Sequence, residues 1–404
     1  MGIEEQNAVV ALFTRANLTG HSLGYNGEEE SAYCREFAEW LGGGHADAVS
    51  SGTAGIYVAL KSLEIDPFQE VIVSAVTDPG GLMPIPLLNL VPMIADTEPG
   101  SYNCGVQQIA PLLSPRTRAI VVAHIGGEPA DIEGIVNLAQ RHSIPVIEDC
   151  SQSHGTSLHG RLVGSFGTIS VFSTMYGKHH SSGGQGGMVF TPNQNLYQRI
   201  RRASDRGKPF FMPDGSTNCV ASLNLNSSEI SAAIGRVQFR KLPRIVARRR
   251  EIVDRLRGLT SSLGTVSVAP QRDGADPSYW FLRMDFHKYA ATCAKRDFCQ
   301  ALEAEGLPIA IDYRAALPHT QEWFINRRVF GASGYPWSSP DYAGDLTREF
   351  PCPNAEAAME RCFNLHFHEH WTDEDVADAA AILSKVDAIF SVRRGAAPVS
   401  GGQL

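Results

Sequence analysis

The sequence lacks the features that would place the protein in a membrane or on a nucleic acid. None of its apolar runs reaches the roughly 20 residues that a membrane-spanning helix needs. Its net charge of −8 gives it no basic excess for binding phosphate backbones or anionic lipid surfaces. We therefore expect neither a nucleic acid nor a membrane as a partner.

The spacing of the eight cysteines matches no known disulfide framework. They form no C-x-x-C pair and have no repeating spacing, so they are typical of reduced thiols rather than of disulfides. The opening residues M-G-I-E-E-Q lack the basic and apolar regions of a signal peptide. We therefore expect a cytoplasmic protein. With 404 residues, 43% of them hydrophobic, it is long enough for two domains with a sizeable core.

Strands and helices alternate between residues 70 and 149. The runs E-V-I-V-S-A from Glu70, R-A-I-V-V-A-H at 118–124 and I-P-V-I-E-D at 144–149 are typical of buried strands, and 131–142 has the pattern of an amphipathic helix. Continuous β-branched runs separated by helices predict an α/β fold with a mostly parallel sheet covered on both faces. Ligands bind such sheets at the carboxyl ends of the strands.

The pattern changes after a long helical region at about 228–262. We place a domain boundary near residue 245, with a large domain at 1–245, a smaller α+β domain at 246–392 and a flexible tail at 393–404. The arginine run at 248–250 is interpreted as a solvated helix face.

The stretch from Gly164 to Thr191 holds a lysine between two short apolar runs. Residues 168–172 and 187–191 each have the character of a buried strand, and Lys178 lies in the turn between them. Partial burial would lower the pKa of its amine and leave part of it neutral, as condensation with an aldehyde requires. An ordinary lysine in a strand-to-strand loop fits this stretch equally well, because lysine is rarely fully buried.

Two further features fall at strand ends. The turn from Ser50 to Thr53 begins a helix whose N–H groups would bind an anion, although a plain helix cap explains it as well. Asp149 ends an apolar strand, and a buried carboxylate needs a cationic partner. The protonated ring nitrogen of pyridoxal phosphate is such a partner, so these residues together with Lys178 indicate a pyridoxal-phosphate site.

Several motifs along the chain form a specific set. They are S-S-G-T-A-G near 50, H-I-G-G-E-P-A-D at 124–131, E-D-C-S-Q-S-H-G at 148–155, the spacing from Ser173 to Lys178, N-L-N-S-S-E-I-S-A-A-I-G-R-V-Q at 224–238 and F-P-C-P-N near 350. In these motifs the sequence resembles the DegT/DnrJ/EryC1/StrS family of pyridoxal-phosphate aminotransferases over nearly its whole length. The resemblance implies the aspartate aminotransferase fold (type I). Y-R-A near 313 and C-P-N near 352 are more like the aminocyclitol and 3-amino-5-hydroxybenzoate synthase branch than the nucleotide-sugar branch.

The resemblance also implies roles for individual residues. Lys178 would form the Schiff base with pyridoxal phosphate and later move the proton. Asp149 would pair with the pyridine nitrogen, and Gln152 would lie near the ring oxygen.

The phosphate of the cofactor would be held by three residues of the same subunit and one of its neighbour. Gly52, Thr53 and Ser173 would bind it from their own chain, while Asn224 would reach in from a second subunit. The resemblance therefore implies a homodimer with shared active sites.

Two positions depart from the family pattern on the substrate side. Where the family usually has an aromatic residue stacked on the cofactor ring, this chain has V-T-D-P-G-G with Asp78, and Pro79-Gly80 implies a different loop. Where the family often has N-x-R, this chain has Asn-Leu-Asn at 224–226. The residues expected to face the substrate are Asp78, His179, Tyr313, Arg314 and His319. A loop contact for His179, and a structural role for the last three, remain alternatives.

Three histidines, His366, His368 and His370, alternate in L-H-F-H-E-H-W and would share one face of a strand. The stretch resembles a family segment without a metal role, so we expect no metal site.

We expect a transaminase that moves an amino group from glutamine or glutamate to a keto-cyclitol, a keto-sugar or a related small ketone in a secondary-metabolite pathway such as antibiotic biosynthesis. A dehydratase or lyase on the same fold is one alternative, but dehydratases of this family replace the lysine by histidine. A non-catalytic regulatory protein is the other, and it would not need Lys178, Asp149 and the phosphate residues together.

Overall fold

The computed structural model describes residues 1–392, so the tail expected at 393–404 lies outside the described residues. The chain forms two compact units. Unit 1 consists of residues 1–250, 271–280 and 314–358, and unit 2 of 251–270, 281–313 and the residues from 359 onward. This division differs from a single boundary at 245 because the chain returns twice to unit 1. Residues 275–276 pair with a strand of unit 1, and Trp337 and Tyr342 pack against Val91.

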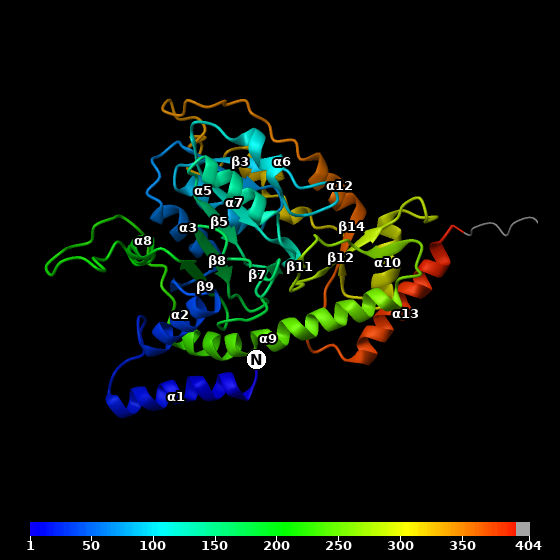
Figure 1. Cartoon of the computed structure of the whole chain (residues 1–404), viewed down its shortest axis with the longest axis horizontal. Coiled ribbons are helices and arrows are strands. Elements are labelled where there is room, and N and C mark those ends of the chain that lie inside the picture. The colour runs from blue at the N-terminus through cyan, green and yellow to red at the C-terminus, as the bar shows by residue number, and fades with distance from the viewer. Residues whose placement is uncertain (393–404) are drawn as a thin grey trace, which may run out of the picture. The chain divides into compact units, whose positions relative to one another are not determined.

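Unit 1 contains the large sheet of the protein (Figure 1). Its seven strands have the order β1-β9-β8-β5-β4-β2-β3. The strands are β1 (His45–Val49), β2 (Glu70–Ser74), β3 (Val91–Ala95), β4 (Thr117–Ala123), β5 (Val146–Asp149), β8 (Ile169–Ser173) and β9 (Gly187–Thr191). Neighbours from β3 to β8 are parallel, whereas β9 runs antiparallel to both β8 and β1. The expected mostly parallel sheet is confirmed. Its carboxyl edge gathers the ends of β1, β2, β5 and β8.

Helices cover both faces of this sheet because its strands are apolar on both sides. On one face, α2 (Glu28–Trp40) and the first part of α9 (Glu229–Leu259) enclose a core that includes Phe37, Phe172 and Phe239, and α7 (Ile132–Arg141) encloses a second core. Against the opposite side of β8 lies α3 (Gly52–Ser62). A Cβ on Gly55 would come within 2.5 Å of Val171, so glycine allows this close packing.

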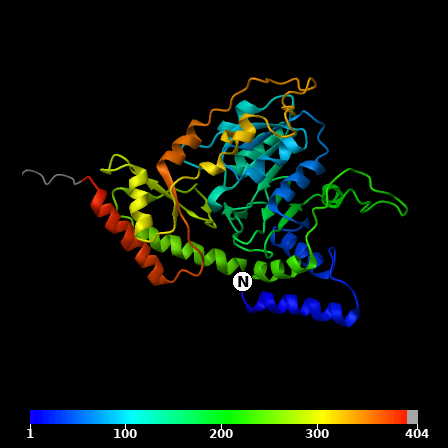
Figure 2. The same ribbon diagram turned by 180° about the vertical axis from the view of Figure 1, so that it is seen from behind.

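The remaining elements of unit 1 are short or peripheral. They are α1 (Ile3–Thr19), α4 (Pro79–Leu82), α5 (Pro84–Leu87), α6 (Val106–Ile109), α8 (Gln194–Ser204), α11 (Glu322–Ile325) and the small sheet of β11 (Ala275–Asp276), β6 (Ser157–Leu158) and β7 (Arg161–Leu162). The N-terminal helix α1 lies along α9 (Figure 2), and Lys241 and Gln238 of α9 bind the Glu5 carboxylate at 2.6 and 2.7 Å.

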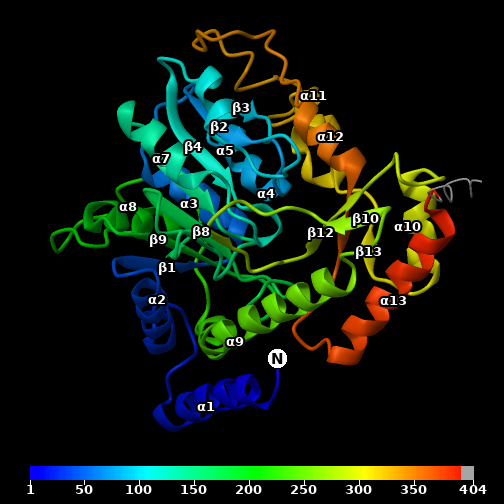
Figure 3. The same ribbon diagram turned by 45° about the vertical axis from the view of Figure 1, so that its right-hand side comes forward.

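Unit 2 contains an antiparallel sheet in the order β10-β12-β14-β13. Its strands are β10 (Val266–Val268), β12 (Leu282–Phe286), β14 (Cys362–Leu365) and β13 (Ile309–Ala310). The helices α10 (Lys295–Ala304) and α13 (Asp373–Phe390) lie side by side next to it (Figure 3), and α12 (Pro353–Arg361) leads into β14. His366, His368 and His370 follow the end of β14 and do not share a strand face. Among residues 1–392, no helix has the length and apolar character needed to cross a bilayer.

Candidate active site

Lys178 lies in the turn between β8 and β9, at the carboxyl edge of the large sheet. Its Nζ lies 4.0 Å from the centre of the Trp280 ring, and Trp280 Nε1 donates a hydrogen bond of 2.8 Å to the carbonyl of Gly177. Burial lowers the pKa of the Lys178 amine from 10.5 to about 8, although the negative charges of Asp149 and Asp78 act in the opposite direction. An amine with this pKa is partly neutral near physiological pH.

Asp149 is the last residue of β5 and is 7% exposed. Its Oδ1 accepts a hydrogen bond of 3.0 Å from the N–H of Ser151. Burial raises the pKa of this carboxyl group, while the Ser151 hydrogen bonds and the charge of Lys178 lower it. A carboxylate held in this way gains stability from a further cation at the same site.

An anion cradle lies where α3 begins. Ser51 caps the helix by accepting from the N–H of Ala54 at 3.0 Å, whereas the N–H groups of Gly52 and Thr53 donate to no other described residue. A Cβ on Gly52 would lie 2.8 Å from the Cβ of Ser173, and one on Gly80 would lie 2.1 Å from Thr53 Oγ1. Glycine at these positions lets the start of α3 approach Ser173 and lets α4 approach Thr53. The N–H groups without acceptors at this helix start are of the kind that bind a phosphate.

Asp78 follows β2 and begins α4. Its carboxylate accepts from the N–H of Gly80 at 2.8 Å, and Pro79 takes the first helical position, which accounts for the D-P-G-G sequence. A Cβ on Gly81 would lie 3.1 Å from Asp149 Oδ2, so the glycine lets α4 approach the buried acid. The departure from the family pattern therefore places a carboxylate near Lys178.

Residues 314–320 contribute a second group of predicted substrate residues. The carbonyl of Ala316 accepts from the N–H of Thr77 at 2.9 Å, which holds the turn Arg314–Ala316 beside the end of β2. Arg314 is exposed there, and His319 is half-buried with a pKa lowered by burial. Tyr313 belongs to unit 2, where its ring packs against Phe281 at 5.2 Å.

Gln152 and His179 are both buried in the packing beneath the turn. Gln152 Oε1 accepts from the N–H of Gly126 at 2.9 Å. His179 Nε2 donates to the carbonyl of Ser278 at 3.0 Å, and burial lowers the pKa of the ring well below its ordinary value. His179 is thus 2% exposed and bound to the backbone, which favours the loop contact over a substrate contact.

Asn224 lies on the surface of this chain, beside the turn that precedes α3. The carbonyl of Leu225 accepts from the N–H of Ser50 at 2.8 Å, and Asn224 Oδ1 accepts from Asn226 Nδ2 at 2.7 Å. Asn224 is exposed, so its side chain is accessible to a second molecule. Of the sequence-predicted residues, unit 1 therefore brings Lys178, Asp149, Asp78 and the cradle to one edge.

The sequence interpretation missed Trp280 and the residues that position it. The arginine run at 248–250 is not a solvated face, because Arg249 is 6% exposed and donates to the carbonyl of Tyr279 at 2.9 Å. Arg250 donates to the carbonyl of Pro277 at 2.9 Å. These guanidinium groups hold the segment that ends at Trp280. No spacing in the sequence pointed to it, since a tryptophan at the start of an apolar strand is typical of a core residue.

Comparisons with known proteins identify the family and the fold of this chain. The model of the DegT/DnrJ/EryC1/StrS aminotransferase family matches residues 12–384. An L-glutamine:2-deoxy-scyllo-inosose aminotransferase of Streptomyces fradiae is 30% identical over 369 residues, which cover 88% of this chain and 85% of that protein. A UDP-N-acetyl-3-dehydro-alpha-D-glucosamine 3-aminotransferase of Acidithiobacillus ferrooxidans is 30% identical over 362 residues, 89% of each chain. The X-ray structure of an aminotransferase from Psychrobacter cryohalolentis aligns with a TM-score of 0.84 and 25% identity, covering 96% of this chain and 98% of that one.

The mostly parallel sheet with helices on both faces is the fold of type I aminotransferases. The chain belongs to the DegT/DnrJ/EryC1/StrS aminotransferase family, so the expected family and fold are confirmed.

Trp280 should control the pKa of the Lys178 amine. In the cofactor-free protein, we expect this amine to titrate near pH 8. The ring attracts the ammonium form but also shields the amine from water, and burial is the larger effect on the pKa. Trp280→Ala admits water, so the pKa should rise toward the ordinary value of 10.5, while Trp280→Phe should keep it low. The measurement is the pH dependence of Lys178 labelling by an amine-reactive ester, read by peptide mass spectrometry. Trp371→Ala in unit 2 is the control, and an unchanged profile in Trp280→Ala would show that the ring does not shield the amine.

Proposed function

We propose that the protein moves an amino group from glutamine or glutamate to a keto-cyclitol, a keto-sugar or a related small ketone in a biosynthetic pathway. One observation carries this proposal: an amine of lowered pKa and a buried carboxyl group lie beside an open helix start. The names of the two relatives support the acceptor class, since one specifies a keto-cyclitol with a glutamine donor and the other a keto-sugar nucleotide. A secondary-metabolite pathway and a cytoplasmic location, the latter supported by eight free cysteines, belong to the same proposal.

Pyridoxal phosphate fits the residues of this site. Gly52, Thr53 and Ser173 would hold its phosphate, because the first two offer unpartnered backbone N–H groups and the glycine brings this helix start against Ser173. Asp149 would pair with its ring nitrogen, since a buried carboxylate is stabilised by a cation. When bound, the cofactor supplies an electron sink for negative charge that develops on the Cα of the amino donor.

The chain's own residues would move and hold the protons. With a pKa of about 8, roughly a tenth of the free Lys178 amine is neutral at pH 7, compared with well under a thousandth at 10.5. The neutral Nζ is then able to take a proton from the donor Cα and to return it during the same turnover. Asp149 would keep the proton on the ring nitrogen. Asp78 and Arg314, both beside the end of β2, would contact the acceptor.

A homodimer with shared sites completes this proposal. Asn224 is exposed on its own chain and sits on a segment bonded to Ser50, next to the cradle. We place it in the phosphate site of the neighbouring subunit.

The assignment of Lys178 is tested by reduction of the purified protein with borohydride. We expect a pyridoxyl group on the peptide that contains Lys178, and none on the peptide with the surface lysine Lys208. Incubation with L-glutamine or L-glutamate should convert the absorbance of pyridoxal phosphate to that of pyridoxamine phosphate, and candidate ketones should reverse it. Lys178→Ala should show neither change. A pyridoxyl group on any other lysine would contradict the assignment.

Asp149→Asn should keep the cofactor but lose most of the transamination activity. Loss of the carboxylate removes the group that holds the ring-nitrogen proton, and one such electrostatic contact is worth ~10²-fold or more in rate. The readouts are kcat and the cofactor content of the purified variant. Asp78→Asn, near the same amine, is the matched control, and we expect it to change the KM for the acceptor more than kcat. Near-native turnover in Asp149→Asn would show that Asp149 has only a structural role.

Mixed dimers test the shared site. When inactive Lys178→Ala and inactive Asn224→Ala proteins exchange subunits, one site of each mixed dimer carries both changes and the other carries neither. In a random one-to-one mixture, activity should return toward about a quarter of the wild-type sites. Lys178→Ala mixed with Asp149→Asn is the control, because those two residues act in the same subunit and no intact site forms. If mass measurements show exchange and the first mixture stays inactive, Asn224 does not serve the neighbour.

A further inference from the structure

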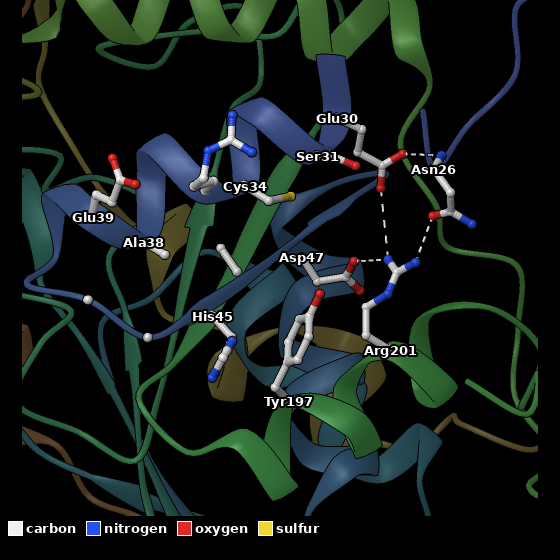
Figure 4. A pocket seen from close by; sticks show the side chains of 14 residues that line it. Asn26, Glu30, Ser31, Cys34, Ala38, Glu39, His45, Asp47, Tyr197 and Arg201 are labelled. Atoms are coloured by element: carbon white, nitrogen blue, oxygen red, sulfur yellow. Dashed lines mark hydrogen bonds and ion pairs between the residues drawn. The ribbon is translucent and has the colours of Figure 1, made fainter. Parts of the chain in front are cut away.

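A polar cavity lies at the opposite edge of the large sheet from Lys178. It has a volume of about 440 Å³ and is bounded by α2, the amino end of β1 and α8 (Figure 4). Its inner end is formed by Glu30, Asp47, Tyr197 and Arg201. Because β1 runs parallel to β8, the cradle at 50–53 follows its carboxyl end, whereas this cavity adjoins His45 to Asp47 at its amino end. The cavity is therefore separate from the candidate active site.

The charges at its inner end do not balance. Asp47 and Glu30 are 1% and 3% exposed, and one guanidinium group, that of Arg201, faces both of them. Arg201 bonds directly to Asp47 Oδ1, and Ser204 donates to Asp47 Oδ2 at 2.6 Å, so Asp47 is fully paired. Two buried carboxylates against one cation leave an unmet negative charge whenever both are ionised.

Glu30 is the carboxylate that lacks a cation at hydrogen-bond distance. Its Oε2 accepts from the N–H of Asn26 at 2.5 Å. Its Oε1 accepts no hydrogen bond from any described residue, and Arg201 Nη1 lies 3.9 Å away. The side chains of Glu30 and Arg201 point toward each other at one end of the cavity (Figure 4). Glu30 is thus 3% exposed, and the Oε1 atom that it turns to the cavity has a long ion pair with Arg201 but accepts no hydrogen bond from a described residue.

Other groups around Glu30 do not supply the missing cation. Burial raises the pKa of Glu30 to about 7; the Asn26 N–H and Arg201 lower it, while Asp47 and Glu229 raise it further. The Glu229 carboxylate is bound by the N–H groups of Glu29 and Glu30 at 3.2 and 2.9 Å.

The rest of the cavity lining consists of neutral side chains and of residues at the mouth of the cavity. Burial raises the pKa of Tyr197 to about 12 and that of Cys34 well above its ordinary value, so both stay neutral. Arg35 and Glu39 are exposed and opposite in sign, and His45 stacks on Tyr197 at 4.9 Å.

We propose that this cavity binds a small organic cation with N–H donors, a primary or secondary ammonium compound, through Glu30 Oε1. The backbone adds an acceptor. The Ala48 carbonyl accepts from Ser227 N–H on the open side of β1, so the carbonyl of Ala46, two residues earlier, faces the same side. A bound ammonium group completes the pairing of two carboxylates with two cations, and the cavity is within the size range of small-molecule sites. This proposal does not depend on the reaction at Lys178.

The probe for the experiment is dimethylammonium chloride, which carries two N–H donors and does not displace a lysine from an aldehyde cofactor as a primary amine does. Binding to the full-length protein is measured by titration calorimetry at pH 8 and pH 6. With a Glu30 pKa of about 7, its ionised fraction falls from about nine-tenths to about one-tenth, so the affinity should fall roughly tenfold. Tetramethylammonium has the same charge but no donor and should bind at least tenfold more weakly at pH 8.

Two variants locate the binding. Glu30→Gln keeps an acceptor for the Asn26 N–H but removes the charge, and we expect it to lose at least tenfold in affinity. Glu39→Gln, at the exposed mouth, should bind as the wild type does. Melting temperatures at pH 6, where most of Glu30 is protonated, check that Glu30→Gln is folded. Should that variant fail to fold, the pH dependence of the wild type still decides. Absence of binding, equal affinity at both pH values, equal affinity for tetramethylammonium, or undiminished binding by folded Glu30→Gln would each overturn the proposal.

Discussion

The burial of the Lys178 amine beside the Asp149 carboxyl group is the constraint on which the site depends. Each group alone would be costly to bury in its charged form. Placed at the ends of neighbouring strands, they partly compensate each other, yet burial still lowers the pKa of the amine and raises that of the acid. The fold thus holds an amine near its neutral form and an acid in need of a cation, which are the two properties that pyridoxal chemistry requires of a protein.

The surrounding structure maintains that burial in two ways, through close backbone packing at glycines and through the Trp280 side chain. Glycines at 52, 80 and 81 bring α3 and α4 against Ser173, Thr53 and Thr77 at distances that a Cβ would not permit. On the other side, Arg249 and Arg250 bind the carbonyls of Tyr279 and Pro277 and thereby fix the segment that brings Trp280 over the amine. The start of α3 offers backbone N–H groups without acceptors, and the Trp280 ring lies 4.0 Å from the Lys178 amine.

The sequence predicts the local elements of the site but not the placement of Trp280. Apolar strands, the lysine between them and the small-residue turn are local patterns, so β2, β4, β5, β8 and the position of Lys178 were predictable. Trp280 was not, because its position depends on guanidinium-to-carbonyl contacts between residues far apart in sequence. The same limit explains the arginine run, which has the composition of a solvated face but is used for buried contacts. Tyr313 and Arg314 are adjacent in sequence, yet they fall in different units.

Polar groups without full partners lie near both ends of β1. Near its carboxyl end, a bare helix start leaves N–H groups without acceptors, and the family's cofactor carries the phosphate that matches them. Near its amino end, Asp47 is neutralised within the chain by Arg201, but Glu30 is left with a loose contact of 3.9 Å. A chain that required only stability there would gain from an uncharged residue at position 30, since an incompletely paired buried carboxylate costs several kcal/mol as a rule. Retention of the charge next to a cavity is therefore better explained by a cation from outside the chain than by packing.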